Sequence, residues 1–154
     1  MNLFFAIDLS GSMQEGAKQF IVLNLLNAVL QGKKLGLITW EIGNIHILYI
    51  AENLEEHFVE DTFDCPMPTE TFSGSQFNVD ALLDYLTNSH QSDNDQFFCF
   101  TDQPPHGVKI PSNLHFVLVG DEYSLILQND SSFLSPEMFA PYLNGLLEKT
   151  GGAV

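Results

Sequence analysis

The sequence lacks arginine and has little positive charge of any kind. Its 154 residues include five basic side chains, all lysine, against 20 acidic ones, which gives a formal net charge of −15 at pH 7. Nucleic acids and anionic membranes attract proteins through basic side chains. The composition therefore argues against both as partners, and we expect this chain to bind neither nucleic acid nor membrane.

Cysteine is equally scarce, and long hydrophobic runs are missing. Cys65 and Cys99 stand alone, with no C-x-x-C or C-x-x-H spacing, so neither a disulfide framework nor a thiolate zinc site is expected. The apolar stretch at residues 3–7 has no basic segment before it and is too short for a signal peptide or a membrane span. These features predict a cytoplasmic protein.

What the chain does contain is ample core material, with 45% hydrophobic residues and 13 phenylalanines. This predicts one domain over residues 1–150 and a flexible tail at 151–154. Apolar runs predict strands, and apolar residues at helical spacing predict helices. We expect strands at 3–7, 34–40, 45–50, 97–100, 114–119 and 123–127, and helices at 13–31, 76–88 and 135–149.

The order of these elements predicts an α/β fold with three layers, α/β/α, around a doubly wound, mostly parallel central sheet. Gly43 and Asn44 are suited to a tight turn, so we expect residues 34–40 and 45–50 to form one antiparallel hairpin at the sheet edge. The acidic, proline-containing stretch at 51–75 is expected to be a long loop.

Small oxygen-bearing side chains follow the predicted strands. Asp8, Ser10 and Ser12 lie on the turn after the first strand, Asp102 ends another strand, and Ser75 lies where the second helix begins. Ligands of open α/β sheets bind at the carboxyl ends of the strands. Five hard oxygen donors without imidazole or thiolate suit Mg²⁺ or Mn²⁺, suit Ca²⁺ less well, and disfavour zinc. The simpler alternative is that Asp8, Ser10 and Ser12 only cap the following helix.

The run Asp8-Leu9-Ser10-Gly11-Ser12 after an apolar strand resembles the D-x-S-x-S motif of von Willebrand factor type A (vWA) domains. The resemblance covers nearly the whole chain in the order and spacing of its elements. It implies a Rossmann-like vWA fold with a metal-ion-dependent adhesion site (MIDAS). By this resemblance Ser10, Ser12 and Ser75 would touch the metal directly, whereas Asp8 and Asp102 would hold it largely through bound waters.

Two segments depart from the usual family pattern. Ser75, in Phe72-Ser73-Gly74-Ser75, replaces the usual threonine, and Ser73 is an alternative third hydroxyl ligand. After Asp102, residues 103–107 (Gln-Pro-Pro-His-Gly) replace the usual glycine and look like a variant of some intracellular members. Little room for a helix remains between the two later strands, so the resemblance implies a shortened intracellular form.

The resemblance implies a protein-interaction module rather than an enzyme, with the metal binding an Asp or Glu side chain of a partner protein. Intracellular members often serve AAA-type ATPases or multiprotein assemblies as subunits or adaptors. Two alternatives stay open. The domain could bind through another face without a metal, or it could be a haloacid-dehalogenase-like phosphotransferase. That class of enzymes uses an acidic residue at the position that Ser10 occupies here.

Overall fold

The computed structural model describes ten stretches of the chain: residues 2–13, 18–34, 45–50, 54–59, 78–89, 95–103, 105, 107, 109–120 and 132–151. Within them lie the strands β1 (Leu3–Asp8), β2 (Ile45–Ile50), β3 (Leu54–Val59), β4 (Gln96–Thr101), β5 (Leu114–Leu118) and β6 (Phe133–Leu134). The helices are α1 (Lys18–Lys34), α2 (Val79–Ser89) and α4 (Pro136–Gly151). None of the helices in these stretches is long and apolar enough to cross a membrane.

A single sheet holds all six strands in the order β3-β2-β1-β4-β5-β6. Every neighbouring pair is parallel except β2 and β3, which run antiparallel at one edge. β1 lies between β2 and β4, with Ala6 opposite Leu48 on one side and Cys99 on the other. All six residues of β1 are buried, which is the pattern expected of a strand covered on both faces.

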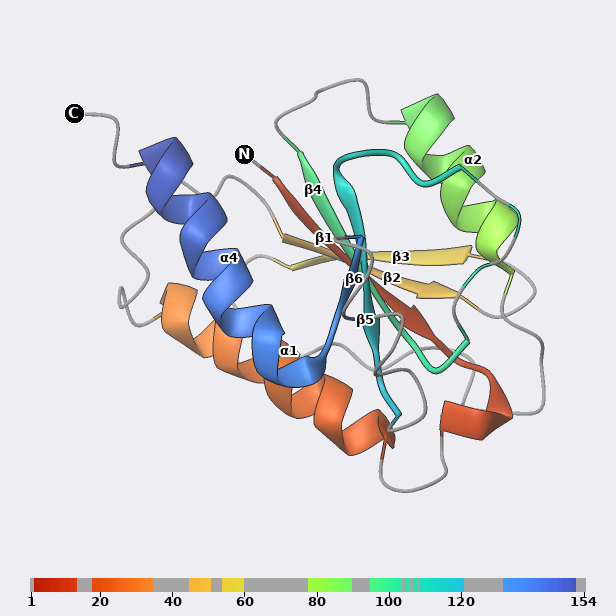
Figure 1. Cartoon of the computed structure of the whole chain (residues 1–154), viewed down its shortest axis with the longest axis horizontal. Coiled ribbons are helices and arrows are strands. Elements are labelled where there is room, and N and C mark those ends of the chain that lie inside the picture. Colours follow the sequence, from red (N-terminus) through yellow and green to blue (C-terminus); the bar gives the residue numbers. More distant parts are fainter. Residues whose placement is uncertain are drawn as a thin grey trace.

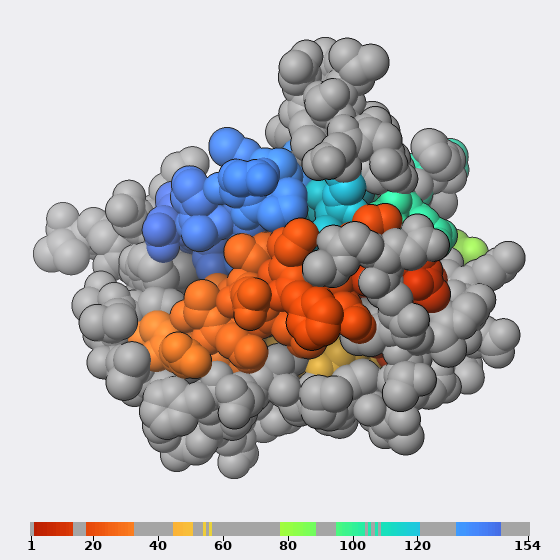
Figure 2. Space-filling view, turned by 90° about the horizontal axis from the view of Figure 1, so that it is seen from below, coloured from red at the N-terminus to blue at the C-terminus, as the bar shows by residue number. Residues whose placement is uncertain are grey.

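Helices cover both faces of this sheet (Figure 1). Alternate residues of β1 point to opposite faces. Leu3, Phe5 and Ile7 pack in a core cluster with α1 and α4, whereas Phe4 and Ala6 pack in a second cluster with α2. Helices α1 and α4 lie side by side on their face (Figure 2). The predicted doubly wound, three-layer α/β/α fold is thereby confirmed.

The antiparallel edge hairpin exists, but its predicted location was wrong. β2 pairs along its whole length with β1 on one side and with β3 on the other, so neither edge is left for residues 34–40. Lys34 ends α1, and residues 35–44 lie outside the described part of the chain. The hairpin is formed by β2 and β3, and β3 occupies six residues of the expected 51–75 loop, including His57.

The reason for this error lies in the composition of β3, whose sequence LEEHFV is not uniformly apolar because Leu54 is followed by two glutamates. An edge strand can carry such charges because one side faces solvent. Glu56 is in fact exposed and contacts His46 of β2 at 2.8 Å. Polar residues of this kind weaken the hydrophobic pattern by which the other strands were predicted.

The remaining elements match their predictions with shifts at their ends. The helix expected at 13–31 is described from Lys18, Met13 belongs to a separate 3₁₀ turn, and residues 14–17 lie outside the described part of the chain. α1 continues through Gly32 to Lys34, and α2 begins at Val79, where the side chain of Asn78 accepts a hydrogen bond from the Ala81 amide at 3.1 Å. Ser135 caps α4 as expected, accepting from the Met138 amide. β6 was not predicted, because two residues are too few for a pattern. The strand expected at 123–127 lies outside the described residues.

Candidate metal site at the carboxyl end of the sheet

The site forms where two neighbouring parallel strands end. β1 ends at Asp8 and β4 ends at Thr101, and the register of the pair places Ile7 opposite Phe100. After β1 the chain makes a short 3₁₀ turn at residues 11–13, closed by a hydrogen bond from the Met13 amide to the Ser10 carbonyl at 3.0 Å. This turn places the side chains of Ser10 and Ser12 next to the end of β4.

Asp8 is fully buried in the site, with no exposed surface. Its Oδ1 accepts a hydrogen bond from the Ser10 amide at 2.7 Å, and its Oδ2 accepts one from Thr101 Oγ1 at 2.6 Å. Burial raises the pKa of Asp8 above its ordinary value, and the nearby charge of Asp102 adds to this, although the bonds from Thr101 and Ser10 oppose it. Asp8 therefore needs compensation when it is ionised.

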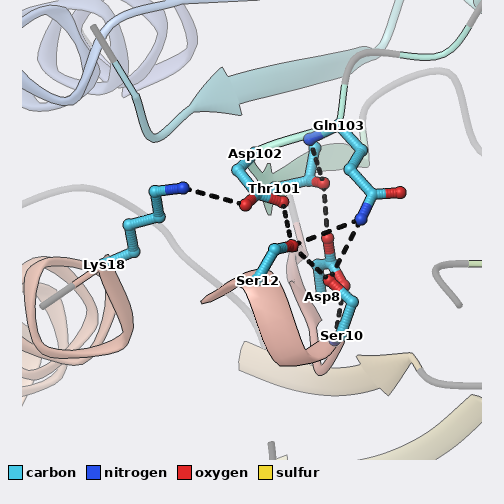
Figure 3. A network of polar contacts seen from close by, with 7 residues as sticks. All are labelled: Asp8, Ser10, Ser12, Lys18, Thr101, Asp102 and Gln103. Atoms are coloured by element: carbon cyan, nitrogen blue, oxygen red, sulfur yellow. Dashed lines mark hydrogen bonds and ion pairs between the residues drawn. The ribbon is translucent and has the colours of Figure 1, made fainter. Parts of the chain in front are cut away.

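The other polar side chains form a continuous network beside Asp8 (Figure 3). Ser12 Oγ donates to Asp102 Oδ1 at 3.0 Å and lies 3.1 Å from Ser10 Oγ. Gln103 Nε2 donates to both serine oxygens at 3.3 Å, and its backbone amide donates to Thr101 Oγ1 at 2.9 Å. Segments about 90 residues apart in the chain thus share one polar cluster.

A lysine completes the cluster from the opposite side of Asp102. Lys18 Nζ lies 3.0 Å from Asp102 Oδ2, and the two side chains are 18% and 5% exposed. The two oxygens of Asp102 are therefore divided between Ser12 and Lys18, as Figure 3 shows. Lys18 is the first residue of α1, so this ion pair joins the helix to the end of β4.

Four of the five predicted site residues come together. Asp8, Ser10, Ser12 and Asp102 lie within one hydrogen-bonded network. The third hydroxyl, Ser75 or its alternative Ser73, lies outside the described residues, so its place stays a prediction. The roles of all five as metal ligands are also predictions.

The chemistry of this donor set fits a hard divalent cation. Two carboxylates and two hydroxyls converge, which matches the oxygen preference of Mg²⁺ and Mn²⁺, with water completing the shell. Within the described stretches no three histidine, cysteine or acidic side chains gather closely enough to hold a metal. A cation here would therefore depend on the serine hydroxyls as well as on the two aspartates.

Three members of the cluster were not among the predicted site residues: Thr101, Gln103 and Lys18. Thr101 and Gln103 flank Asp102, so their positions beside a predicted site residue were an available signal. Lys18 offered no local signal, because it lies 84 residues from Asp102 and only the packing of α1 brings it there.

No family model matches the sequence, and no curated protein matches it. Several solved structures do match the fold. The ArnB paralog VWA2 from Sulfolobus acidocaldarius has a TM-score of 0.58 at 16% identity, over 98% of this chain and 45% of that one. Proximal thread matrix protein 1 from the mussel byssus has a TM-score of 0.57 at 11% identity, over 96% of this chain and 47% of that one.

A further crystal structure of the same mussel protein has a zinc-occupied MIDAS motif. It matches with a TM-score of 0.53 at 13% identity, over 96% of this chain and 45% of that one. The chain thus spans under half the length of each of these structures. At such low identity the likeness shows a shared fold, and the fold of this chain is that of vWA domains.

Proposed function

We propose that this chain is a protein-interaction module of the vWA type that binds its partner through a divalent cation. The observation that carries the proposal is the convergence of Asp8, Ser10, Ser12 and Asp102 at the carboxyl ends of β1 and β4. The fold shared with a mussel protein whose MIDAS motif holds zinc supports the same reading. We propose Mg²⁺ or Mn²⁺ as the cation of this chain, on the basis of its hard oxygen donors.

The residues of the proposed site would have different roles, according to how deeply each is buried. Asp8, fully buried and fixed by Ser10 and Thr101, would anchor the site from below. Ser10 and Ser12 would present their hydroxyls to the cation, and Asp102 would orient Ser12. The third hydroxyl of the proposed set is Ser75 or Ser73. When bound, the cation would supply fixed positive charge and one open coordination position.

The partner group that suits such a position is a carboxylate. At a net charge of −15 the chain repels acidic side chains, and a divalent cation inverts that field locally. We therefore propose that the module binds an Asp or Glu side chain of another protein, in the cytoplasm, as an adaptor or subunit of a multiprotein assembly or an AAA-type ATPase.

We also propose that the module is not catalytic. A phosphotransferase of the haloacid-dehalogenase kind would need Asp8 as an exposed nucleophile, yet Asp8 has no exposed surface and both its oxygens accept hydrogen bonds. Hydrolysis of a generic phosphate ester that is lost in Asp8→Ala would contradict this assignment.

One observation favours a second candidate, a vWA-like scaffold that binds through another face without metal. The ion pair with Lys18 supplies positive charge to Asp102, so the cluster has internal charge compensation. The two candidates differ in what a divalent cation does to stability.

Thermal unfolding with added MgCl₂ or MnCl₂ distinguishes them. A ligand bound only by the folded state stabilises it by RT ln(1 + [L]/Kd), about 1.4 kcal/mol at ten times Kd, or about 3–6 °C for a chain of this size. We expect this shift in the wild type and its loss in Asp8→Asn and in Ser10→Ala. Asp84→Asn, which removes an exposed acid on α2, should keep it.

Salt must be matched, because any divalent cation screens a chain this acidic. NaCl at the same ionic strength therefore serves as the reference. Equal shifts in the wild type and Asp8→Asn, or none in either, would overturn the metal proposal and favour the metal-free scaffold. Partner capture from lysate should then be insensitive to EDTA, whereas the metal proposal expects EDTA to abolish it.

A further inference from the structure

Lys18 occupies an unusual place for a positive charge. It is the first residue of α1, and the first turn of that helix contains no acidic residue. A helix N-terminus carries the positive end of the macrodipole, so a cation there is unfavourable for the helix itself. One compensating interaction is the 3.0 Å ion pair with Asp102, made by a lysine side chain only 18% exposed.

The charges of the cluster indicate what this lysine does. Asp8 and Asp102 contribute two negative charges where exposure is 0% and 5%, and Lys18 contributes one positive charge. Buried charges are stable when they are paired. Among the described residues, a divalent cation alone would neutralise both carboxylates, whereas a divalent cation together with Lys18 would leave one positive charge in excess until a partner carboxylate binds. Before a partner binds, Lys18 and the metal are therefore competing counter-ions of Asp102.

The geometry supports the same exclusivity. Asp102 Oδ1 faces the serines through Ser12, while Oδ2 faces Lys18 (Figure 3). A cation at the serine oxygens would share the Asp102 carboxylate with the ammonium group, and two cations on one carboxylate repel each other. Weakening of the Lys18 contact relieves this repulsion.

We propose that Lys18 is a built-in competitor of the divalent cation: its ammonium group neutralises Asp102 in the metal-free protein and is displaced when the metal binds. This inference rests on the proposed function. It makes the cation affinity of the site lower than its oxygen donors alone would give. It also couples the occupancy of the site to the first turn of α1.

The first test compares Mn²⁺ binding by calorimetry in the wild type, Lys18→Met and Lys109→Met. Lys18→Met keeps an unbranched side chain and removes the charge, and Lys109→Met removes an equal charge from an exposed position between β4 and β5. We expect Lys18→Met to bind Mn²⁺ about tenfold more tightly, which corresponds to about 1.4 kcal/mol. Lys109→Met should bind like the wild type.

Each outcome has a distinct meaning. Equal or weaker binding by Lys18→Met overturns the competition and leaves the metal site in place. A gain of the same size in Lys109→Met also overturns it, because the effect would then come from net charge alone. Absence of Mn²⁺ binding in all three proteins overturns the proposed function, and the competition with it.

A second test needs no Lys18 variant and so does not depend on one folding. Acetylation of the wild type by a limiting amine-reactive ester, read by mass spectrometry, reports how available each lysine is. We expect MgCl₂ to speed acetylation of Lys18 severalfold relative to NaCl of equal ionic strength, with Lys109 as the internal reference. The increase should vanish in Asp8→Asn. A Lys18 rate that Mg²⁺ leaves unchanged or slows would overturn the proposal.

Discussion

The hydroxyl of Thr101 is the support on which the buried carboxylate of Asp8 depends. Thr101 Oγ1 donates to Asp8 Oδ2 at 2.6 Å and accepts from the Gln103 amide at 2.9 Å, and neither Thr101 nor Asp8 is exposed. Thr101→Val removes both bonds while conserving the shape of the side chain. The substitution therefore isolates the contribution of the hydroxyl.

The expected loss of stability follows from these two contacts. An ionised, buried acceptor that loses its donor costs about 1–3 kcal/mol, and the Gln103 amide adds about 0.5–1 kcal/mol. Valine can fit a strand better than threonine, and at the end of β4 this would offset up to about 1 kcal/mol of the lost stability. We therefore expect a net loss of about 0.5–4 kcal/mol in metal-free buffer at pH 7.

Urea unfolding in EDTA measures this loss, with Thr101→Ser as the control that retains the hydroxyl. The loss in Thr101→Val should shrink in acid, because a protonated Asp8 is neutral and needs less compensation. A Thr101→Val protein within about 0.5 kcal/mol of the wild type at pH 7 would refute the reasoning. A loss of equal size in Thr101→Ser would refute it too, because the hydroxyl would then not be the cause.

Three other predictions concern the same carboxylate and the core beneath it. The pKa of Asp8 is raised in the folded state, so the metal-free wild type should lose stability relative to Asp8→Asn as the pH rises from the ordinary pKa of 3.8 through the raised pKa. Mg²⁺ should reverse this trend. Denaturant unfolding across that pH range, with and without Mg²⁺, measures both effects. Phe139 packs edge-on against the rings of Phe98 and Phe100, with ring centroids 5.3 and 5.2 Å apart. Phe139→Ala should therefore lower the free energy of unfolding by about 3–5 kcal/mol, and Phe139→Leu should lower it by less. Equal small losses for both variants in urea unfolding would contradict this packing. Cys99 is fully buried, and its pKa is raised by burial and by the charge of Asp8. In a Cys65→Ser background its thiol should therefore react with a thiol-specific reagent only after unfolding. Rapid labelling of the native protein would contradict the burial of this thiol.

The local part of the site could be predicted from the sequence, because its residues are close in the chain. Asp8, Ser10 and Ser12 lie on one turn after a doubly buried strand, and the Asp8 carboxylate does bind the Ser10 amide two residues away. The place of Asp102 followed from a second apolar run that ends on an acid. The rule that parallel strands end at one edge then sufficed to bring Asp102 to the serines.

The edge of the sheet could not be predicted in the same way. Strand pairing depends on segments that can lie far apart in the chain. From composition alone, the antiparallel partner of β2 could be residues 34–40 or β3, and composition favoured the more apolar residues 34–40. Glu55 and Glu56 hid β3, although a strand at an edge tolerates them, and the two residues of β6 gave no periodicity. Burial on both faces marks inner strands, and edge strands lack that mark.

By itself, then, the sequence determined the alternation of strands and helices, the inner strands and the two halves of the oxygen cluster, since each depends on hydrophobic pattern or on contacts within a few residues. Tertiary structure alone decided the edge pairing of β2 with β3, the support of Asp8 by Thr101 and the ion pair of Lys18 with Asp102. The physical reason is range. Each of these contacts joins groups whose distance is fixed by how helices and strands pack, and no spacing along the chain encodes it.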